Sequence, residues 1–225
     1  MGDAVGQMLA SAVGIAISPL PLIAVVLMLA TPRGKVNGTA FTLGWMVTLG
    51  VITTAVVLAS SGAGADDAGT PARWTYWLKL ALGVLFLLMG AKQWKDRPWE
   101  GQDHALPGWM RAIDHFTPVR AAGLAALLSG ANPKNLVLAI GGAASIASST
   151  ASGGGKAVAG VLFVVVGSAC VLLPLLVFVF GGSRSAAVLG GWKTWMGEHN
   201  SAIMTVVLAV LGAKYLGDAI SGLTS

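Results

Sequence analysis

The chain has 225 residues, of which 55% are hydrophobic and only 10% are charged, and its mean hydropathy is +0.77. Water-soluble domains average about a quarter charged residues, so the composition excludes an ordinary soluble globule and predicts a polytopic membrane protein. The formal net charge of +5 does not indicate nucleic-acid binding, because the basic residues lie mostly between apolar runs and form no stripe with interleaved aromatic residues.

The first residues, "MGDAVGQM", lack the basic region that opens a secretory signal peptide. We therefore expect the first apolar run to stay in the protein as a membrane span. Cys170 is the one cysteine of the chain. A single thiol excludes an internal disulfide and any relay between two thiols of the same chain.

Apolar runs of about 20 residues are long enough to cross the hydrocarbon layer of a bilayer. Polar segments separate six such runs, among them "TPRGKVNG" after the first, "SSTASGGGK" after the fourth and "GGSRSAAVLGGWKTWMGEHN" after the fifth. The longest connection, 95–119, is amphipathic, and we expect a short helix at 107–115 within it. The sequence thus predicts an all-α fold with spans at 5–30, 38–60, 74–94, 120–149, 156–181 and 200–222.

The basic residues are distributed unevenly over the two sides of these spans. Membrane proteins retain an excess of Lys and Arg in their cytoplasmic loops. The predicted location is therefore the inner (plasma) membrane, with 95–119 in the cytoplasm and both termini outside. The basic side carries Arg33, Lys35, Lys95, Arg97, Arg111, Arg120, Arg184 and Lys193, whereas the other side carries Arg73 and Lys156 together with Asp66 and Asp67. Interfacial anchors are expected at Trp74, Trp77, Trp94, Trp99, Trp109, Trp192 and Trp195.

Two spans contain residues that a membrane helix normally avoids: "SPLP" in the first and "NPKN" in the fourth. Proline lacks the backbone donor and clashes with the carbonyl four residues earlier. The freed carbonyls are tolerated at membrane depth only beside protein or a water-filled cavity. We predict that the first and fourth helices are broken there and that their half-helix N-termini favour an anionic ligand. The alternative is a proline kink packed by neighbouring helices without any ligand. The residues concerned are Ser18, Pro19, Pro21, Asn132, Pro133, Lys134 and Asn135.

The two halves of the chain resemble each other. Gly90-Ala91-Lys92 at the end of the third run recurs as Gly212-Ala213-Lys214 in the sixth, and "SPLP" corresponds to "NPKN". Because each half has three spans, the halves enter the membrane from opposite faces, an arrangement common in secondary transporters. We predict two inverted three-helix repeats, 1–94 and 120–225, joined by the cytoplasmic connector 95–119.

Lysines are the ionisable residues inside or close to the spans, where a charge is costly and is by default a functional candidate. We expect Lys134 and Lys214 to face an internal cavity, with Lys92 as a third candidate, and Lys79 to reach the membrane surface. No carboxylate lies deep in a span, so the interior suits an anionic substrate group. No metal-ligand cluster, nucleotide loop or nucleophile–base pair is apparent. The sequence predicts a protein without a cofactor or metal that is not an enzyme.

The segments "ISPLPLIAVVLMLATPRGKVNGTAFTLGW" and "SGANPKNLVLAIGGA" resemble the GAP/Sap family of actinobacterial membrane proteins, the glycopeptidolipid- and sulfolipid-addressing proteins of the LysE exporter superfamily. The resemblance covers nearly the whole chain. It implies six spans in two inverted repeats and a role in moving cell-envelope glycolipids to the outer leaflet. The superfamily's two-cysteine thiol carriers do not fit a chain with one cysteine. The matching positions are Ser18, Pro19, Pro21, Pro32, Arg33, Asn132, Pro133, Lys134 and Asn135.

Three functions stay open at this point. The first is an exporter or flippase-like transporter of an anionic lipid or glycolipid, whose headgroup lies against Asn132, Lys134, Asn135 and Lys214 while its tails follow an opening between helices. The second is a LysE-type exporter of amino acids or other small solutes, for which we expect a closed polar pocket. The third is a scaffold for lipid-export machinery. A homodimer and proteins of lipid synthesis or export are candidate partners, and the energy source is not visible in the sequence.

Overall fold

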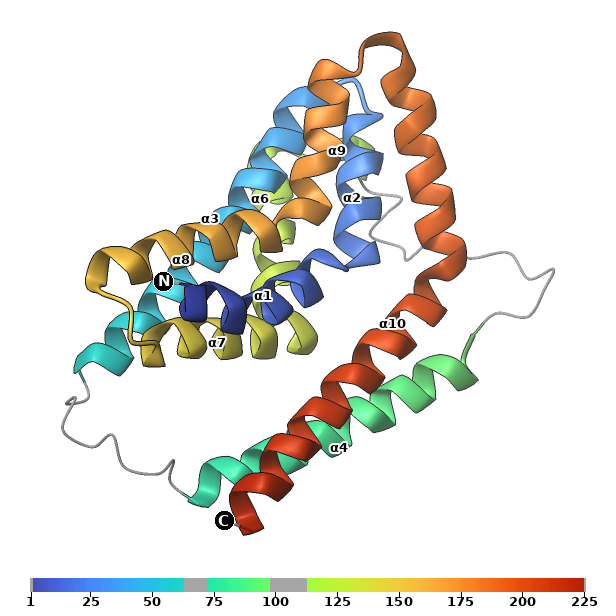
Figure 1. Cartoon of the computed structure of the whole chain (residues 1–225). Coiled ribbons are helices and arrows are strands. Elements are labelled where there is room, and N and C mark those ends of the chain that lie inside the picture. Colours follow the sequence, from blue (N-terminus) through green and yellow to red (C-terminus); the bar gives the residue numbers. More distant parts are fainter. Residues whose placement is uncertain (1, 63–72, 98–112, 225) are drawn as a thin grey trace. The chain divides into compact units, whose positions relative to one another are not determined.

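The computed structural model describes residues 2–62, 73–97 and 113–224, which form helices and no strand (Figure 1). The helices are apolar, as the composition predicts, and the protein is an all-helical membrane protein. Most of the connector 95–119, including the start of the helix predicted at 107–115, lies outside the described residues. Its last part forms the short 3₁₀ helix η1, Ile113–His115.

The first predicted span is broken at its Ser-Pro-Leu-Pro motif. Helix α1 (Gly2–Ala16) ends before the motif, and α2 (Pro19–Leu29) begins inside it with a proline in its first turn. The two helices are bent by 48° relative to each other. Ile17 and Ser18 lie between them, and Ser18 has an extended backbone with φ −131° and ψ 99°. The predicted break is confirmed.

The fourth predicted span is also broken at its motif. Helix α6 (Pro118–Ala126) continues into a π-helical turn η2 (Leu127–Ala131), and α7 (Pro133–Ser148) starts one residue later. Asn132 between them is extended because a residue before proline is pushed away from helical geometry. This break is confirmed as well.

The fifth span contains a break that the sequence did not predict. Helices α8 (Gly153–Gly167) and α9 (Ala169–Phe180) meet at Ser168 with a bend of 67°. Adjacent glycine and serine residues are a known cause of helix kinks. The proline of this span, Pro174, lies beyond the bend, inside α9.

The remaining long helices are α3 (Gly34–Gly62), α4 (Arg73–Lys95) and α10 (Ser185–Thr224). The predicted loop between the fifth and sixth spans is wrong, since all but its first residues belong to the 40-residue helix α10. This stretch has glycines but no proline, so nothing in it stops a helix. By length and composition the described helices offer two candidate spans, or four if each bent pair is one span.

The helices form two compact units, which do not follow the sequential halves. Unit 1 comprises Met1–Gly64 and Ala105–Gly197, and unit 2 comprises Ala65–His104 and Glu198–Ser225. In unit 1, α1 packs against α7 and α8, α2 against α9, and α3 against α6 and α7 (Figure 1). The boundaries at residues 94 and 120 were inferred from a duplication in the sequence. The division into compact units does not test that duplication, so these boundaries stay a prediction.

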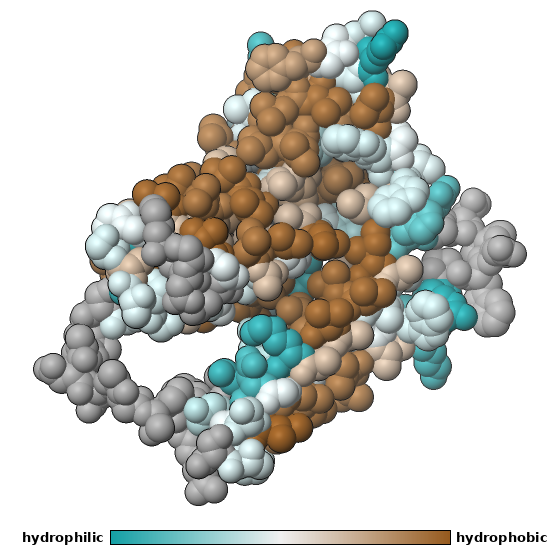
Figure 2. Space-filling view, in the orientation of Figure 1, coloured by the Kyte–Doolittle hydropathy of each residue, from teal (hydrophilic) through white to brown (hydrophobic). Residues whose placement is uncertain are grey.

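The core of unit 1 consists of large side chains fitted against glycines. Trp45, Phe41 and Phe163 are fully buried. A Cβ atom on Gly142 of α7 would collide with the Phe163 ring of α8, so the glycine permits this close approach. Figure 2 shows hydrophobic atoms also on the outside, covering much of α8 and α9. A surface this apolar matches a lipid environment rather than water.

Unit 2 pairs α4 with the C-terminal part of α10. Each helix offers a glycine to the other: Gly90 lies against Leu208, and Gly212 against Leu87. The rings of Phe86 and Tyr215 meet edge to face with centroids 5.8 Å apart. These are the glycines of the repeated Gly-Ala-Lys motif, so both copies of the motif take part in the same helix–helix interface.

Candidate functional site

Lys134 lies in the first turn of α7 and is almost completely buried, with 2% of its surface exposed. Its ammonium group donates hydrogen bonds to the carbonyl oxygens of Gly14 at 3.0 Å and Ile17 at 2.9 Å, and to the hydroxyl of Ser18 at 2.8 Å. An ammonium has three donors. All three are therefore used by the break between α1 and α2.

The prolines of the first motif explain why these acceptors are available. In an uninterrupted helix, residues 19 and 21 would donate to the carbonyls of Ile15 and Ile17, but proline has no backbone donor. The Ser18 hydroxyl is 2.7 Å from the Ile15 carbonyl, and the Lys134 ammonium takes the Ile17 carbonyl. The C-terminal end of a helix carries partial negative charge, which a cation stabilises. The lysine of one motif thus completes the helix end that the other motif interrupts.

The two asparagines of the fourth span complete the second break in a similar way. Asn132 caps α7, since its side-chain oxygen accepts from the Lys134 backbone N–H at 3.1 Å. In the spacing of the π-helical turn, the Leu128 carbonyl would accept from residue 133, which is a proline without a backbone donor. The Asn135 side-chain amide donates to that carbonyl at 3.0 Å instead. Asn135 is fully buried. Its amide therefore replaces a backbone hydrogen bond that the membrane interior could not supply.

The two breaks also meet directly. The Ser18 hydroxyl lies 3.2 Å from the Asn135 side-chain oxygen. A hydroxyl has one proton, so Ser18 donates either to this oxygen or to the closer Ile15 carbonyl while it accepts from Lys134. We call Ser18, Asn132, Lys134 and Asn135 the break cluster. Its polar groups satisfy one another, and Pro19, Pro21 and Pro133 lie in the adjoining helix starts.

The third break lies close to this cluster. A Cβ atom on Gly167 would be 3.6 Å from the Ile15 side chain of α1. The indole N–H of Trp45 points to the Gly167 carbonyl at 3.4 Å, while the hydroxyl of the fully buried Ser168 has no hydrogen-bond partner among the described residues. Sequence reasoning missed these residues. The available signals were a tryptophan in the middle of a span and a Gly-Ser pair within an apolar run.

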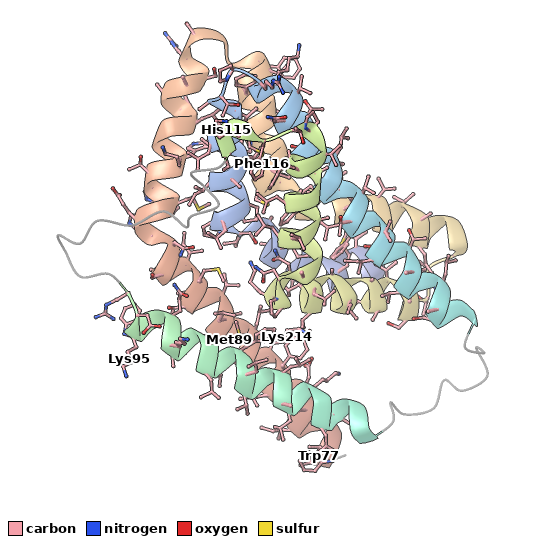
Figure 3. All side chains as sticks on the ribbon, turned by 180° about the vertical axis from the view of Figure 1, so that it is seen from behind. Trp77, Met89, Lys95, His115, Phe116 and Lys214 are labelled. Carbon is pink, nitrogen blue, oxygen red and sulfur yellow. The ribbon has the colours of Figure 1, made fainter. Side chains whose placement is uncertain are left out.

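The other predicted site lysines belong to unit 2. Lys214 is exposed on α10, with 57% of its side chain accessible, and its ammonium is 3.3 Å from the Asp218 carboxylate. Lys92 is exposed near the end of α4. Lys79 lies over the Tyr76 ring at 5.5 Å from its centroid. Figure 3 labels Lys214 on α10, and it labels Trp77 and Lys95 near the two ends of α4. The structure thus groups four of the predicted site residues in the break cluster and places Lys92 and Lys214 in the other unit.

A groove between α3 and α8 has a volume of about 630 Å³, and it is partly open to the surroundings. Among the described residues that line it, the charged one is Lys156, whose ammonium donates to the Ala147 carbonyl at 2.6 Å. The residues of this α3–α8 groove are Met46, Gly50, Thr53, Thr54, Val57, Leu58, Gly153, Lys156, Ala157, Gly160, Val161, Val164 and Val165.

Two smaller cavities differ in chemistry. One, of about 380 Å³, is lined by Pro32, Arg33, His115 and Phe116, and Figure 3 labels its His115 and Phe116. The other, of about 150 Å³, lies between α2, α9 and the start of α10. In the part of the chain that the structure describes, no three His, Cys, Asp or Glu side chains are arranged to hold a metal ion.

Comparison with known proteins identifies the family. A family model described as Sap, sulfolipid-1-addressing protein, matches residues 8–221. No curated protein and no solved structure matches the chain. The match covers all three helix breaks and nearly the whole chain. As the resemblance of its two proline motifs predicted, the chain belongs to the Sap family of sulfolipid-1-addressing proteins.

Proposed function

We propose that the protein is a membrane carrier, an exporter or flippase, that moves an anionic amphipathic lipid or glycolipid toward the outer leaflet of the cell envelope. The family description supports a role in lipid export or addressing. The observation that carries the proposal is the break cluster. It joins two interrupted helices through one buried cation and acceptors that a substrate can replace.

The break cluster has the properties of a hinge. Separating α1 from α7 without a replacement would leave a buried ammonium and the Gly14 and Ile17 carbonyls unpaired, each at a cost of about 1–3 kcal/mol or more. An anionic headgroup offers Lys134 a charged acceptor in exchange for the Ser18 hydroxyl and the two carbonyls. Substrate binding and opening of the break are then coupled, as an exporter requires.

The α3–α8 groove favours a lipid over a small polar solute. The rival LysE-type exporter of amino acids predicts a closed polar pocket, whereas this cavity is partly open and its lining is mostly apolar. Lipid tails are the natural occupants of such a surface. Lys92 and Lys214 remain part of the proposal as further contacts for the headgroup along its path.

The six-span inverted repeat belongs to the same proposal. Each compact unit takes equivalent spans from both halves of the chain: the first, second, fourth and fifth in unit 1, and the third and sixth in unit 2. The two proline motifs bond to each other, and both Gly-Ala-Lys glycines pack in one interface. A pseudo-twofold relation between the halves accounts for both pairings.

Reconstitution tests the function. Purified protein in liposomes should move a fluorescent anionic lipid between leaflets, measured by quenching of the label that remains outside, while Ser18→Ala and Lys134→Met should slow it. A matched control is Ser145→Ala, which removes a hydroxyl that donates to the Gly141 carbonyl of the same helix, α7. Movement of amino acids but not lipid would establish the solute exporter. No movement without added lipid-synthesis or export proteins would favour the scaffold.

The same liposomes test whether the protein acts chemically on the lipid. We propose that it does not, so mass spectrometry of the recovered lipid should show an unchanged mass. Cross-linking of the reconstituted protein tests the proposed homodimer. A conversion of the lipid would contradict the carrier and point to an enzyme.

A further inference from the structure

Glycines on α3 and α8 leave the space that forms the α3–α8 groove. An ideal Cβ atom on Gly50 of α3 or on Gly153 of α8 would meet nothing within 4 Å. On Gly160 it would meet only the Thr53 methyl group, at an ordinary contact distance of 3.8 Å. Larger residues would therefore fit at these positions without disturbing the packing of the helices. They would fill the groove instead.

One end of the groove is positively charged for two independent reasons. Lys156 lies in the first turn of α8, and this turn contains no acidic residue. The N-terminus of a helix is itself electropositive, so a lysine there is unfavourable unless negative partners surround it. The Ala147 carbonyl, at the end of α7, accepts one of the three ammonium protons. Among the described residues the other two donors have no partner, and the neighbouring glycines leave space for an anion.

The volume of the groove suits a single acyl chain rather than another helix. Small-molecule sites have volumes of roughly 300–1,000 Å³, and the groove has about 630 Å³. Twelve of the thirteen described residues that line it are uncharged, and the side chains of Val57, Leu58, Val161, Val164 and Val165 present hydrocarbon. An apolar groove that ends at a cation is complementary to an anionic lipid, which joins an apolar chain to a negative headgroup.

We propose that the α3–α8 groove binds one acyl chain of an anionic lipid, with the phosphate or sulfate ester of its headgroup on Lys156. Binding requires no transport. Only the identification of this lipid as the cargo rests on the proposed function. By the predicted topology Lys156 faces the outside, so the groove is the place where the cargo leaves the protein.

Native mass spectrometry of the full chain in detergent, with equal amounts of phosphatidylglycerol and phosphatidylcholine, tests the proposal. The wild-type protein should retain phosphatidylglycerol preferentially. Gly160→Leu, or Gly50→Leu if the first variant does not fold, should lower retention of both lipids. Lys156→Gln should lower the preference about tenfold, the effect of one lost hydrogen bond to a charged group, and Lys156→Arg should restore it.

Two control variants separate the groove from the rest of the surface. Gly123→Leu adds the same side chain on α6, where a Cβ atom also meets nothing within 4 Å, and Lys193→Gln removes a charge from another cavity. Both should retain lipid as the wild type does. Equal retention by all variants would mean annular lipid only, and co-purification of a protein segment in the groove would identify a different occupant. Either result overturns the proposal.

The two proposals fail in different ways. Selective binding that responds to Gly160→Leu and Lys156→Gln, without lipid movement in liposomes, would support lipid binding in the groove and contradict the carrier function. Lipid movement at the wild-type rate in both variants, with unchanged binding, would support the carrier function and contradict lipid binding in the groove.

Discussion

The Lys134 ammonium lies 2.9 Å from the carbonyl oxygen of Ile17, a carbonyl to which Pro21 cannot donate. A residue of the second half of the chain thus supplies the hydrogen bond that a proline of the first half removes. Burial of a charge is costly unless the charge is fully hydrogen-bonded. The two motifs are therefore parts of one structure, and a change in either affects the other.

Lys134→Met should destabilise the protein. The variant leaves the Gly14 and Ile17 carbonyls without donors at about 1–3 kcal/mol each, so we expect a loss of about 2–5 kcal/mol. Unfolding in sodium dodecyl sulfate, followed by tryptophan fluorescence, measures it. A stability equal to that of the wild type would show that these bonds do not hold the break together.

Ser18 and Lys134 should be energetically coupled. The Ser18 hydroxyl accepts from the ammonium at 2.8 Å, so the double variant Ser18→Ala/Lys134→Met should cost less than the two single changes added together. Contacting residues in one network show coupling of about 0.5–3 kcal/mol. The same double-mutant cycle with Ser145→Ala in place of Ser18→Ala should be additive, and coupling of equal size in both cycles would contradict the break cluster.

Lys214→Met should hardly change stability. The Lys214–Asp218 pair is exposed, and exposed pairs within one helix contribute less than about 1 kcal/mol. Lipid movement in liposomes is the decisive measurement, with Lys79→Met as the comparison because Lys79 is predicted only to reach the membrane surface. If the two variants transport equally well, Lys214 is not part of the substrate path.

Gly142→Ala should destabilise unit 1 by about 1–3 kcal/mol, the usual cost of overpacking. The added methyl group collides with the Phe163 ring. Phe163→Leu in the same chain should recover part of the loss, and Gly123→Ala, in open space on α6, should be tolerated. Melting temperatures in detergent compare the four proteins. A Gly142→Ala protein as stable as the wild type would show that α7 and α8 pack less closely.

Cysteine labelling tests the predicted orientation. Cys170 is buried, with 4% of its surface exposed, so a membrane-impermeant maleimide should leave the native protein unlabelled in intact cells. Single cysteines introduced at Thr150 should react from outside, whereas cysteines at Lys35 should react only after the membrane is opened. Labelling in the reverse order would place the basic loops outside and contradict the positive-inside assignment.

The helix breaks were predictable where proline causes them, because the loss of a backbone donor is a local property of the sequence. The bend at Ser168 was missed because Gly167 and Ser168 weaken a helix only modestly, and the contacts of Gly167 with Trp45 and Ile15 come from distant segments. The long helix α10 was missed because a loop was predicted where the helix continues. Its polar residues were interpreted as a loop, although nothing among them ends a helix.

The break cluster, too, could be predicted from the sequence only in part. Its members were identified from residue type alone, because amides and a cation in an apolar run need partners. The partners themselves were not predictable: the sequence suggested an open cavity beside Lys134, and the structure fills that place with carbonyl groups of α1. Which residues of a distant segment lie opposite a buried lysine depends on the packing of α1 against α7, and no local pattern encodes it.

Helix α10 has 40 residues, and at 1.5 Å per residue it is about 60 Å long, roughly twice the thickness of the bilayer's hydrocarbon layer. The division between the two units falls within it, between Gly197 and Glu198. A continuous helix of this length cannot lie within that layer as one straight crossing, so part of α10 must extend into the interfacial region or the water beside the membrane. The residues that begin α10, from Ser185 to Asn200, include the polar side chains Lys193, Glu198 and His199, which suit that environment.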